Sequence, residues 1–478
     1  MPLNGQPVRV RYAPSPTGAL HLGGARTALF NFLFARQQDG QFLLRIEDTD
    51  RARLKEGSQE SIEQGLRWLG MQWDEPPVIQ SQRKEVYREA AGSLLESGAA
   101  YRCFCTPERL EQMRAEQRAR HEPERYDRHC RGIPREESDR RAAAGERYVI
   151  RQAMPLEGST TFVDLVMGSV TFRNETLDDH VLLKSDGFPT YHLAFAVDDH
   201  QSRISHVIRG DGWLPSAPKH LLLFQAFDWL PPAFAHVPLV LGPDKKPLAK
   251  RHGAKDVLEY RDAGYLPEAV DNFIAFLGWS PGTEQDVLTM DELIAKFSIE
   301  KIQASPAIAN LERLDWLNGQ FIRRMPAAEL AERVAPKLPG TSAVAVLPLI
   351  PLVQERLRSL NEAPEMLRFF FEPPKDYRPE QVIPKGKDAR SARSGLERAA
   401  ECLGGVTPWD GPSIEAALRA LAEEVGWSSR DLFMALRVAV TGRPVTPPLI
   451  ESIAHLDRHD VVDRIKRAAE KLAVSSPN

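Results

Sequence analysis

Residues 14–24 read PSPTGALHLGG and stand between a short strand pattern at residues 8–12 and an apolar helix pattern at residues 26–36. A second apolar run at residues 42–46 and an amphipathic helix pattern at residues 59–69 follow. Strands that alternate with helices of this length predict a parallel sheet with crossover helices. We therefore predict a doubly wound, Rossmann-type α/β domain.

The rest of the chain changes in texture twice. Residues 101–151 are rich in arginine and hold three of the four cysteines, which indicates an α+β insertion with its own structure. After strand-like runs at residues 161–172 and 181–184, the α/β pattern returns at residues 191–208. Beyond residue 311 the patterns are mainly helical, which predicts an all-α C-terminal part.

Two helix starts can be predicted in the helical part. Ser413 is expected to cap a helix over residues 414–424. Ser428 with Asp431 forms a capping-box pattern ahead of residues 432–440.

Length and composition limit the class of protein. A chain of 478 residues with 42% hydrophobic and 27% charged residues is expected to form several globular domains. Because the N-terminus lacks a signal-peptide core and no apolar stretch could span a bilayer, we expect a cytoplasmic protein with no membrane partner. Four cysteines in so long a chain are not a disulfide framework. A net charge of −4 leaves a nucleic-acid partner open, since a basic stripe can occupy one face.

The PSPTGALHLGG stretch carries the first chemical signal. It is expected at the carboxyl-terminal edge of the parallel sheet, where α/β proteins bind ligands. Glycines there let a nucleotide approach the backbone, and the N-terminus of the next helix favours phosphate. His21 can donate hydrogen bonds to phosphate oxygens as negative charge develops. The alternative is a turn rich in Pro and Gly with a surface histidine.

A second signal lies far downstream, where residues 242–254 read GPDKKPLAKRHGA. A mobile loop that carries Lys250 and Arg251 beside glycine can close over a triphosphate and neutralise its charge. The alternative is an ordinary solvated basic loop. Alone, this segment decides nothing.

Together, the two stretches resemble the "HIGH" and "KMSKS" signatures of class I aminoacyl-tRNA synthetases, in the right order and at the right separation. Further strings make the resemblance specific to the bacterial-type glutamyl-tRNA synthetases, and it runs through nearly the whole chain. These strings are RYAPSPTG (11–18), RIEDTD (45–50), PTYH (189–192), HVIRG (206–210) and ALRVAVTG (435–442). The helical C-terminal part favours the glutamate enzymes, because glutaminyl-tRNA synthetases usually carry β-barrel anticodon domains.

The resemblance implies a monomeric, ATP-dependent ligase that joins L-glutamate to tRNA-Glu through a glutamyl-adenylate, with Mg²⁺ on the phosphates. In this family the amino acid is typically activated only when tRNA is bound. Two alternatives stay open. One is a duplicated enzyme that charges tRNA-Gln, and the other is a catalytically silent paralogue that only binds tRNA or amino acid.

Carried over by position, the resemblance implies three sets of site residues. Those that hold glutamate are Arg11, Ser15, Glu47, Tyr191 and Arg209. Those that bind ATP are Ser15, Thr17, Gly18, His21, Gly24, Trp213 and Lys250. Those that act in catalysis are His21, Gly23, Gly24, Lys250 and Arg251.

The chemistry of these side chains agrees with the glutamate set. Arg209 is suited to a bidentate grip on the γ-carboxylate, Tyr191 can supply a hydroxyl, and Glu47 can accept from the α-ammonium group. Trp213 is expected on the adenine side. The alternatives are an acidic loop at residues 47–50 that caps a helix or binds a cation, and ordinary core packing for Trp213.

The resemblance also implies a division into six parts. They are the first half of the catalytic core (1–97), an acceptor-stem-binding insertion (98–188), the second half of the core (189–240), a lysine-loop and stem-contact domain (241–322), and two helical anticodon-binding modules (323–378 and 379–478).

The lysine loop departs from the family pattern at two positions. The usual core of this loop begins with Lys and has Ser at its third place, and these positions are Pro247 and Ala249 here. Proline also stiffens the loop by fixing φ. We therefore predict weaker use of ATP than in a typical member.

A second departure concerns zinc. Cys103, Cys105 and Cys130 match the zinc pattern of some members, whose fourth ligand lies two residues after the last cysteine, at Gly132 here. His129 or His121 could complete a tetrahedral site. The alternative is three reduced thiols in an insertion that no longer binds zinc.

The arginine-rich insertion and the helical tail are the predicted tRNA contacts, to the acceptor stem and the anticodon. Arg368 is expected to correspond to a family arginine that reads the last anticodon base. Contacts to phosphates should make tRNA affinity fall steeply with salt. The alternative for any single arginine is a solvated charged face, since Glu and Asp are interleaved with the Arg.

Overall fold

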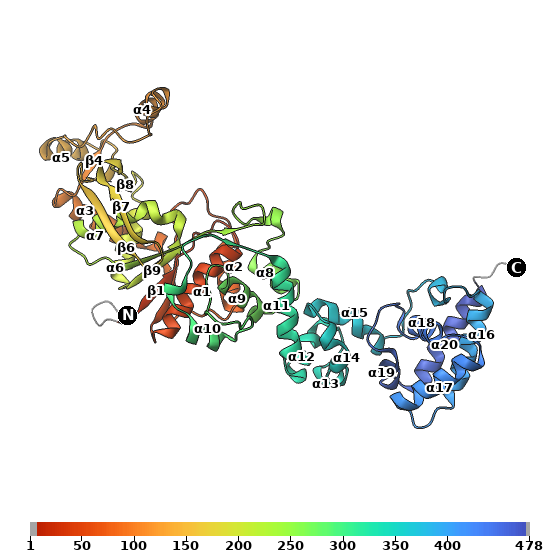
Figure 1. The fold of residues 1–478 in the computed structure, drawn as a ribbon. Helices are drawn as coiled ribbons and strands as arrows, with labels where there is room; N and C mark the ends of the chain where they lie inside the picture. The colour runs from red at the N-terminus through yellow and green to blue at the C-terminus, as the bar shows by residue number, and fades with distance from the viewer. Residues whose placement is uncertain (1–6, 475–478) are drawn as a thin grey trace. The chain divides into compact units, whose positions relative to one another are not determined.

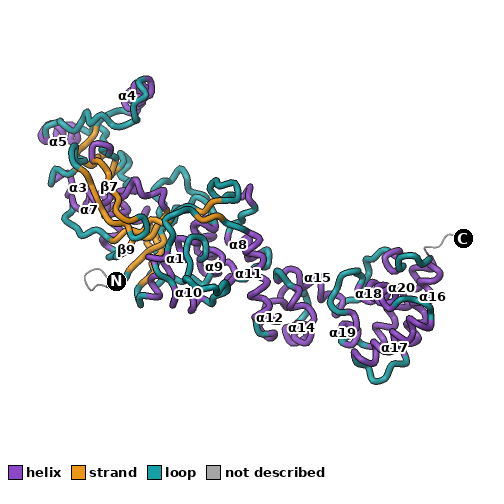
Figure 2. The backbone as a smooth tube through the Cα atoms, viewed as in Figure 1, coloured by secondary structure: helices purple, strands orange, loops and turns teal. Residues whose placement is uncertain are grey.

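The computed structural model describes residues 7–474, apart from the side chains of Lys250 and Val474. The chain forms two compact units. The first consists of the residues up to Asp262 with Pro267–Leu314, and the second of Ala263–Leu266 with the residues from Asp315 on. Figure 2 shows strands in the first unit, while the second unit is built from helices and loops.

The first unit alternates strands and helices along the chain (Figure 1). Its strands are β1 (Arg9–Tyr12), β2 (Gln41–Ile46), β3 (Val78–Ile79), β4 (Ala100–Cys103), β5 (Val149–Gln152), β6 (Ser159–Asp164), β7 (Gly168–Arg173), β8 (Val181–Leu183), β9 (His206–Gly210), β10 (Ala233–Val237), β11 (Val240–Leu241) and β12 (Ala307–Ile308). Its helices are α1 (Leu22–Gln37), α2 (Ser58–Trp68), α3 (Lys84–Glu96), α4 (Pro107–Ala119), α5 (Arg135–Ala143), α6 (Tyr191–Gln201), α7 (Ala217–Ala226), α8 (Val257–Asp262), α9 (Pro267–Ala275) and α10 (Met290–Lys296).

The predicted parallel core is confirmed. β1, β2 and β3 form one parallel sheet, and a second sheet has the order β7-β6-β10-β9, in which β6, β10 and β9 run parallel. The two sheets meet where Ser205 N donates to the Arg9 carbonyl at 2.9 Å. The strand pattern predicted at residues 161–172 forms the β6–β7 hairpin at the outer edge of this layer.

Helices cover both faces of the core because adjacent strand residues point to opposite sides. On one face, Phe42 of β2 meets Phe32 of α1 edge to face, at 5.7 Å between ring centroids. On the other, Leu43 of β2 and Val207 of β9 join a buried apolar cluster with residues of α3, α6 and α7. The carboxyl ends of β1, β2 and β9 stay open between these layers.

The arginine-rich insertion has a small antiparallel sheet of its own, with the order β4-β5-β8. Helices α4 and α5 lie between β4 and β5 in the sequence (Figure 1). Neither helix has more than one buried residue. Their arginines are exposed except for Arg109 and Arg141, which are half-buried.

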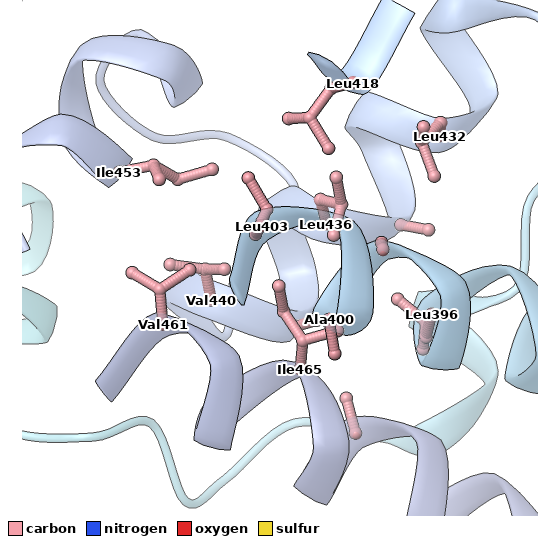
Figure 3. Close-up of a cluster of buried hydrophobic side chains, with 14 of the residues drawn as sticks. Leu396, Ala400, Leu403, Leu418, Leu432, Leu436, Val440, Ile453, Val461 and Ile465 are labelled. Carbon is pink, nitrogen blue, oxygen red and sulfur yellow. The ribbon is translucent and has the colours of Figure 1, made fainter. Parts of the chain in front are cut away.

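The second unit is all-α, as predicted. Its helices are α12 (Ala327–Val334), α13 (Ala343–Val346), α14 (Ile350–Val353), α15 (Ala363–Leu367), α16 (Ala389–Gly404), α17 (Gly411–Glu424), α18 (Ser429–Thr441), α19 (Leu449–Ala454) and α20 (Arg458–Val474), and α11 (Leu311–Arg324) runs across the boundary between the units. Figure 3 shows its main core, where Leu403 of α16, Leu436 of α18 and Ile465 of α20 pack together, each with 0% exposure.

One predicted helix start is wrong and the other is half right. α17 begins after Asp410, whose carboxylate accepts from Ser413 N at 2.9 Å, so Asp410 and not Ser413 is the cap. Proline is tolerated in the first turn, so Pro412 does not delay the start. Ser428 caps α18 by accepting from Asp431 N at 3.1 Å. The Asp431 carboxylate accepts from the Ser428 hydroxyl at 2.7 Å instead of from its backbone, so the reciprocal half of a capping box is missing.

Among residues 7–474, no helix combines the length and apolarity that a membrane crossing would require.

Candidate active site

A cavity of 530 Å³ opens at the carboxyl ends of β1, β2 and β9. Such an edge is where doubly wound sheets bind ligands. The structure brings all the predicted glutamate residues to its lining, namely Arg11, Ser15, Glu47, Tyr191 and Arg209. Thr17, Gly18 and His21 of the predicted ATP set also line this first cavity.

Buried charges form a network beneath the first cavity. Asp199 on α6, with 1% exposure, pairs with Arg11 Nε at 2.9 Å and with Arg45 Nη1. Arg45 also holds Glu47 at 3.0 Å. Burial alone would raise the pKa of Asp199, but the charges of Arg11 and Arg45 outweigh it and lower that pKa. With Arg209 included, three buried guanidinium groups face two carboxylates, and the exposed Arg53 also lines the cavity. The wall therefore carries excess positive charge, which suits an anionic ligand.

Arg209 is held by four hydrogen bonds from its guanidinium. Nε donates to His236 Nε2 at 3.0 Å, Nη1 donates to the Tyr191 hydroxyl at 3.0 Å and to His220 Nδ1 at 3.3 Å, and Nη2 donates to the Trp213 carbonyl at 3.3 Å. Burial lowers the pKa of Arg209, but an arginine in a protein stays charged. The side chain is therefore a fixed cation in the wall of the cavity.

His21 stands at the N-terminus of α1 and caps it. Its Nδ1 accepts from Gly24 N at 3.1 Å, so in the neutral ring the proton sits on Nε2, which is free to donate. Desolvation by its neighbours lowers the pKa of His21, and the nearby Asp256 carboxylate opposes this. Gly24 must be small, because a Cβ there would lie 2.7 Å from the Tyr12 hydroxyl. The motif thus combines a helix cap and a hydrogen-bond donor at His21 with a close approach of Gly24 to Tyr12.

A second cavity of 690 Å³ adjoins the first, and His21 and Gly18 line both. Gly23, Gly24 and Arg26 of α1 line it from one side, and Pro247, Leu248 and Ala249 of the lysine loop line it from another. The two predicted motifs therefore meet. Lys55 and Lys255 also line this cavity, although the sequence had not drawn attention to them.

The described part of the structure does not place either predicted loop cation, Lys250 or Arg251, against these cavities. The backbone of Lys250 begins a short 3-10 turn, Lys250–His252, but its side chain lies outside the described part of the structure. Arg251 is exposed and lines neither cavity, and its nearest described carboxylate is Asp244 at 3.9 Å. Its predicted catalytic placement therefore gains no geometric support.

The predicted place of Trp213 beside adenine stays a prediction. Trp213 lines the first cavity, where its ring lies 4.2 Å from that of Tyr191, and not the second cavity beside the lysine loop. Trp213 is 44% exposed, so the alternative of ordinary core packing is wrong. The acidic stretch divides in a similar way: Glu47 faces the cavity, while Asp48 accepts from Ser81 N at 2.7 Å.

Three side chains that hold the arginines of the first cavity from behind were missed, namely Asp199, His220 and His236. The sequence did hold a signal for Asp199, because Asp198 and Asp199 directly follow the apolar run at residues 193–197. The structure buries both. A carboxylate is rarely buried unless it is paired. The two histidines carry no comparable signal.

The three predicted zinc cysteines come together, with the Sγ atoms of Cys103, Cys105 and Cys130 within 4.8 Å of one another. The hydroxyl of Tyr126 lies among them, 3.3 Å from Cys103 Sγ and 3.4 Å from Cys105 Sγ. The structure does not bring the suggested fourth ligands to the cysteines: His121 and His129 are exposed, and neither belongs to the group found among the described residues.

In the second unit, Arg368 lines a cavity of 300 Å³. Arg443 shares this lining and pairs with Glu365 at 3.0 Å. Gly442, from the string ALRVAVTG, ends α18 with φ of 78°, and a Cβ there would lie 2.7 Å from Pro374 Cβ. This glycine therefore shapes the cavity wall.

Comparisons with known proteins agree over both units. The family described as "tRNA synthetases class I (E and Q), catalytic domain" matches residues 7–316, and the family described as "Anticodon binding domain" matches residues 329–469. Glutamate–tRNA ligases of Dehalococcoides mccartyi and Roseiflexus castenholzii are each 45% identical to this chain; the alignments cover 98% of it and 98% and 97% of theirs. A solved structure of a glutamate tRNA ligase from Elizabethkingia meningosepticum, in complex with its amino acid, matches with a TM-score of 0.88 at 34% identity, over 98% of this chain and 100% of that one.

Proposed function

The chain belongs to the glutamate–tRNA ligases of the class I tRNA synthetases, and on that premise we propose that it charges tRNA with glutamate at the two cavities that meet at His21. The observation that carries this proposal is the meeting of residues 14–24 and 247–249 around one cleft beside Arg209. A silent paralogue and a tRNA-Gln-charging copy are not favoured, because near-full-length relatives are glutamate–tRNA ligases.

Glutamate is proposed to occupy the first cavity. Arg209 offers its charge to the γ-carboxylate, with the Tyr191 hydroxyl beside it at 3.0 Å. Glu47 can accept from the α-ammonium group, and the remaining N–H groups of Arg11 are available to a carboxylate. The excess positive charge of the wall suits an anionic amino acid, so the cavity itself supports glutamate.

ATP is proposed to occupy the second cavity, with its α-phosphate near His21. An oxygen of the glutamate α-carboxylate attacks the α-phosphorus, which gives glutamyl-adenylate and releases pyrophosphate. The 3′-terminal adenosine hydroxyl of tRNA then attacks the acyl carbon, and AMP leaves. His21 Nε2–H can stabilise charge on the phosphate, and the work of catalysis is orientation and electrostatics.

Cations for the phosphates are proposed to come from several sources. Arg26 is committed elsewhere, since it donates to the carbonyls of Leu277 and Pro238. Lys55 and Lys255 are the other cations among the described residues that line the second cavity. The family implies that Mg²⁺ adds charge neutralisation when it accompanies ATP, and Lys250 stays a prediction.

tRNA is proposed to contact the exposed arginines of the insertion and the cavity around Arg368. The division into six parts, with the acceptor-stem role at 98–188 and anticodon roles at 323–378 and 379–478, belongs to this proposal. So do the monomeric state, the cytoplasmic location and the choice of tRNA-Glu over tRNA-Gln.

A zinc ion in the insertion fits the donor set. Cys103, Cys105 and Cys130 would hold it, and the Tyr126 hydroxyl is the oxygen donor closest at hand. Zinc would supply structural cross-linking there. Metal analysis of protein purified without added zinc should give one equivalent, reduced in Tyr126→Phe but not in the neighbouring control Tyr148→Phe. Clearly less than one equivalent in the natural protein would reject zinc.

The proposed function is tested by charging assays with purified tRNA-Glu and tRNA-Gln, ATP and labelled glutamate. Rapid ester formation on tRNA-Glu alone is the expected result. Charging of tRNA-Gln would replace the tRNA assignment, and no charging of either, with tRNA binding intact, would identify a silent paralogue.

A further inference from the structure

Beyond the residues that line the first cavity, a chain of buried side chains runs behind Arg209. Asp164, His236, His220 and His192 form it together with Arg209, and the first three have at most 1% exposure. None of the four lines the first cavity. His236 and His220 reach the cavity through the guanidinium of Arg209, and the rings of His220 and His192 also lie 5.5 and 5.6 Å from that of Tyr191, which lines it.

On one side of Arg209 the chain ends in a carboxylate. His236 Nδ1 lies 2.6 Å from Asp164 Oδ2. Asp164 is itself fixed by the backbone N–H groups of Val166 and Met167, which donate to its Oδ1 at 3.0 and 2.9 Å. Burial alone would raise the pKa of Asp164, but the hydrogen bonds from His236 and Met167 outweigh it and lower that pKa. This carboxylate is a fixed anchor.

On the other side the chain continues through two imidazoles. His220 Nδ1 lies 3.3 Å from Arg209 Nη1, and His220 Nε2 lies 3.0 Å from His192 Nδ1. The ring of His220 stacks on Phe195 at 4.0 Å. Burial lowers the pKa values of both histidines, that of His192 to about 3, and the charge of Arg209 acts in the same direction.

The charge of Arg209 dictates where each histidine proton sits. A guanidinium can only donate, so His236 Nε2 and His220 Nδ1 must both be unprotonated acceptors. In the neutral rings the remaining protons then lie on His236 Nδ1, facing Asp164, and on His220 Nε2, facing His192. Each of these hydrogen bonds then has one donor and one acceptor, and together they fix the rotation of the Arg209 guanidinium.

We propose that His236 and His220 are positioning residues that orient Arg209 toward the side-chain carboxylate of bound glutamate, with Asp164 and His192 fixing their tautomers. This deepens the proposed function and rests on it. Arginine has five N–H donors, and the four contacts of Arg209 leave one on Nη2, which together with the bond now made to Tyr191 is available to the ligand. These four side chains set which N–H donors of Arg209 face the cavity. They therefore govern the choice of a carboxylate ligand over the corresponding amide.

Two pairs of variants test the proposal. His236→Leu removes the acceptor for Arg209 Nε, whereas His236→Gln can offer a carbonyl oxygen near the position of Nε2. His220→Leu and His220→Asn form the same contrast at Nδ1. The matched control is His206→Leu, a buried histidine on the same strand as Arg209 whose ring packs against Phe34 at 4.9 Å.

Aminoacylation of tRNA-Glu is measured with varied glutamate, ATP and glutamine. The leucine variants should raise the KM for glutamate by roughly 10- to 100-fold, as expected for losing a hydrogen bond to a charged group. Their preference for glutamate over glutamine, as a ratio of kcat/KM values, should fall by a similar factor, while the KM for ATP stays near that of the natural protein. The Gln and Asn variants should recover most of both losses.

The results that would overturn the proposal are distinct from failure of the proposed function. A natural protein that does not charge tRNA-Glu contradicts the function itself. With an active natural protein, an unchanged glutamate preference, equal behaviour of the Leu and Gln or Asn variants, or an equal rise in KM for His206→Leu would show that the histidines merely fill the core. If one leucine variant fails to fold, the pair at the other histidine gives the answer.

Discussion

The two cavities that share His21 differ in how far their charged side chains are buried. In the first, most charged side chains are buried: Arg11, Arg45 and Arg209 have at most 5% exposure, and Asp199 has 1%. Arg11 and Arg45 pair with Asp199, and only Arg53 of the arginines in the lining is exposed. In the second, the buried Arg26 is bound to two backbone carbonyls, Lys55 and Lys255 are exposed, and the lysine-loop positions 247–249 carry no charge. The contrast indicates that selection of the amino acid is fixed when the protein folds. The hold on the nucleotide phosphates, by comparison, depends on solvated and movable groups.

The largest effect is expected where a buried pair is broken. Asp199→Asn leaves Arg11 buried without its counter-charge and Arg45 with Glu47 alone, which should cost about 3–5 kcal/mol of stability and abolish tight glutamate binding. Scanning calorimetry of the first unit's unfolding and the KM for glutamate measure this. The control Glu63→Gln breaks a surface pair with Arg67 and should change stability by less than about 1 kcal/mol. Equal shifts in the two variants would remove the contrast between the cavities.

The next effect concerns the residue that both cavities share. His21→Asn keeps a good helix cap but removes the Nε2–H donor, so kcat should fall roughly 100- to 1000-fold while thermal stability is unchanged. His21→Ala should lose about 1 kcal/mol of stability in addition. Single-turnover adenylate formation in the presence of tRNA measures the rate. A His21→Asn variant with nearly normal kcat would mean that His21 is a cap and nothing more.

A smaller effect is expected at the second cavity. Lys55→Ala and Lys255→Ala should each raise the KM for ATP by roughly fivefold at low salt and by less at high salt, because exposed charges are screened. The KM for glutamate should not move. Lys296→Ala on α10, which lines neither cavity, is the matched control. An effect that is independent of salt would argue against contact with the phosphates.

The smallest effect is expected for restoring the loop. Pro247→Lys with Ala249→Ser should raise ATP–pyrophosphate exchange in the presence of tRNA by roughly two- to fivefold, since it adds a cation and frees φ. Lys55 and Lys255 already supply charge in this cavity, so the gain should be larger when both are alanine. Equal exchange rates before and after the change would reject the prediction of weaker ATP use.

Which features could be predicted from the sequence depends on the range of the interactions that form them. Local patterns predicted the parallel core, the helical second unit and the cap at Ser428, because periodicity and capping act within a few residues. They misplaced the start of α17, since Asp410 and Ser413 are both good caps and the sequence alone does not rank them. The six-part division stays a prediction.

The resemblance to a family predicted the residues that line the first cavity. It did not predict the side chains that hold them in place. Asp199, His236 and Tyr126 carry no motif of their own, and each acts on a side chain far away in the sequence. The role of Trp213 beside adenine stays a prediction for a related reason. Its place in the chain follows from β9, but which cavity its ring faces depends on packing against Tyr191.

The sequence by itself determined the α/β core, the two signature loops and the types of charge that serve the reaction. The tertiary structure alone decided which charges cancel, which histidine nitrogens carry protons and which lysines face the nucleotide. The physical reason is that propensity and motif spacing are local, whereas burial raises the cost of an unpaired charge and so makes its distant partners decisive.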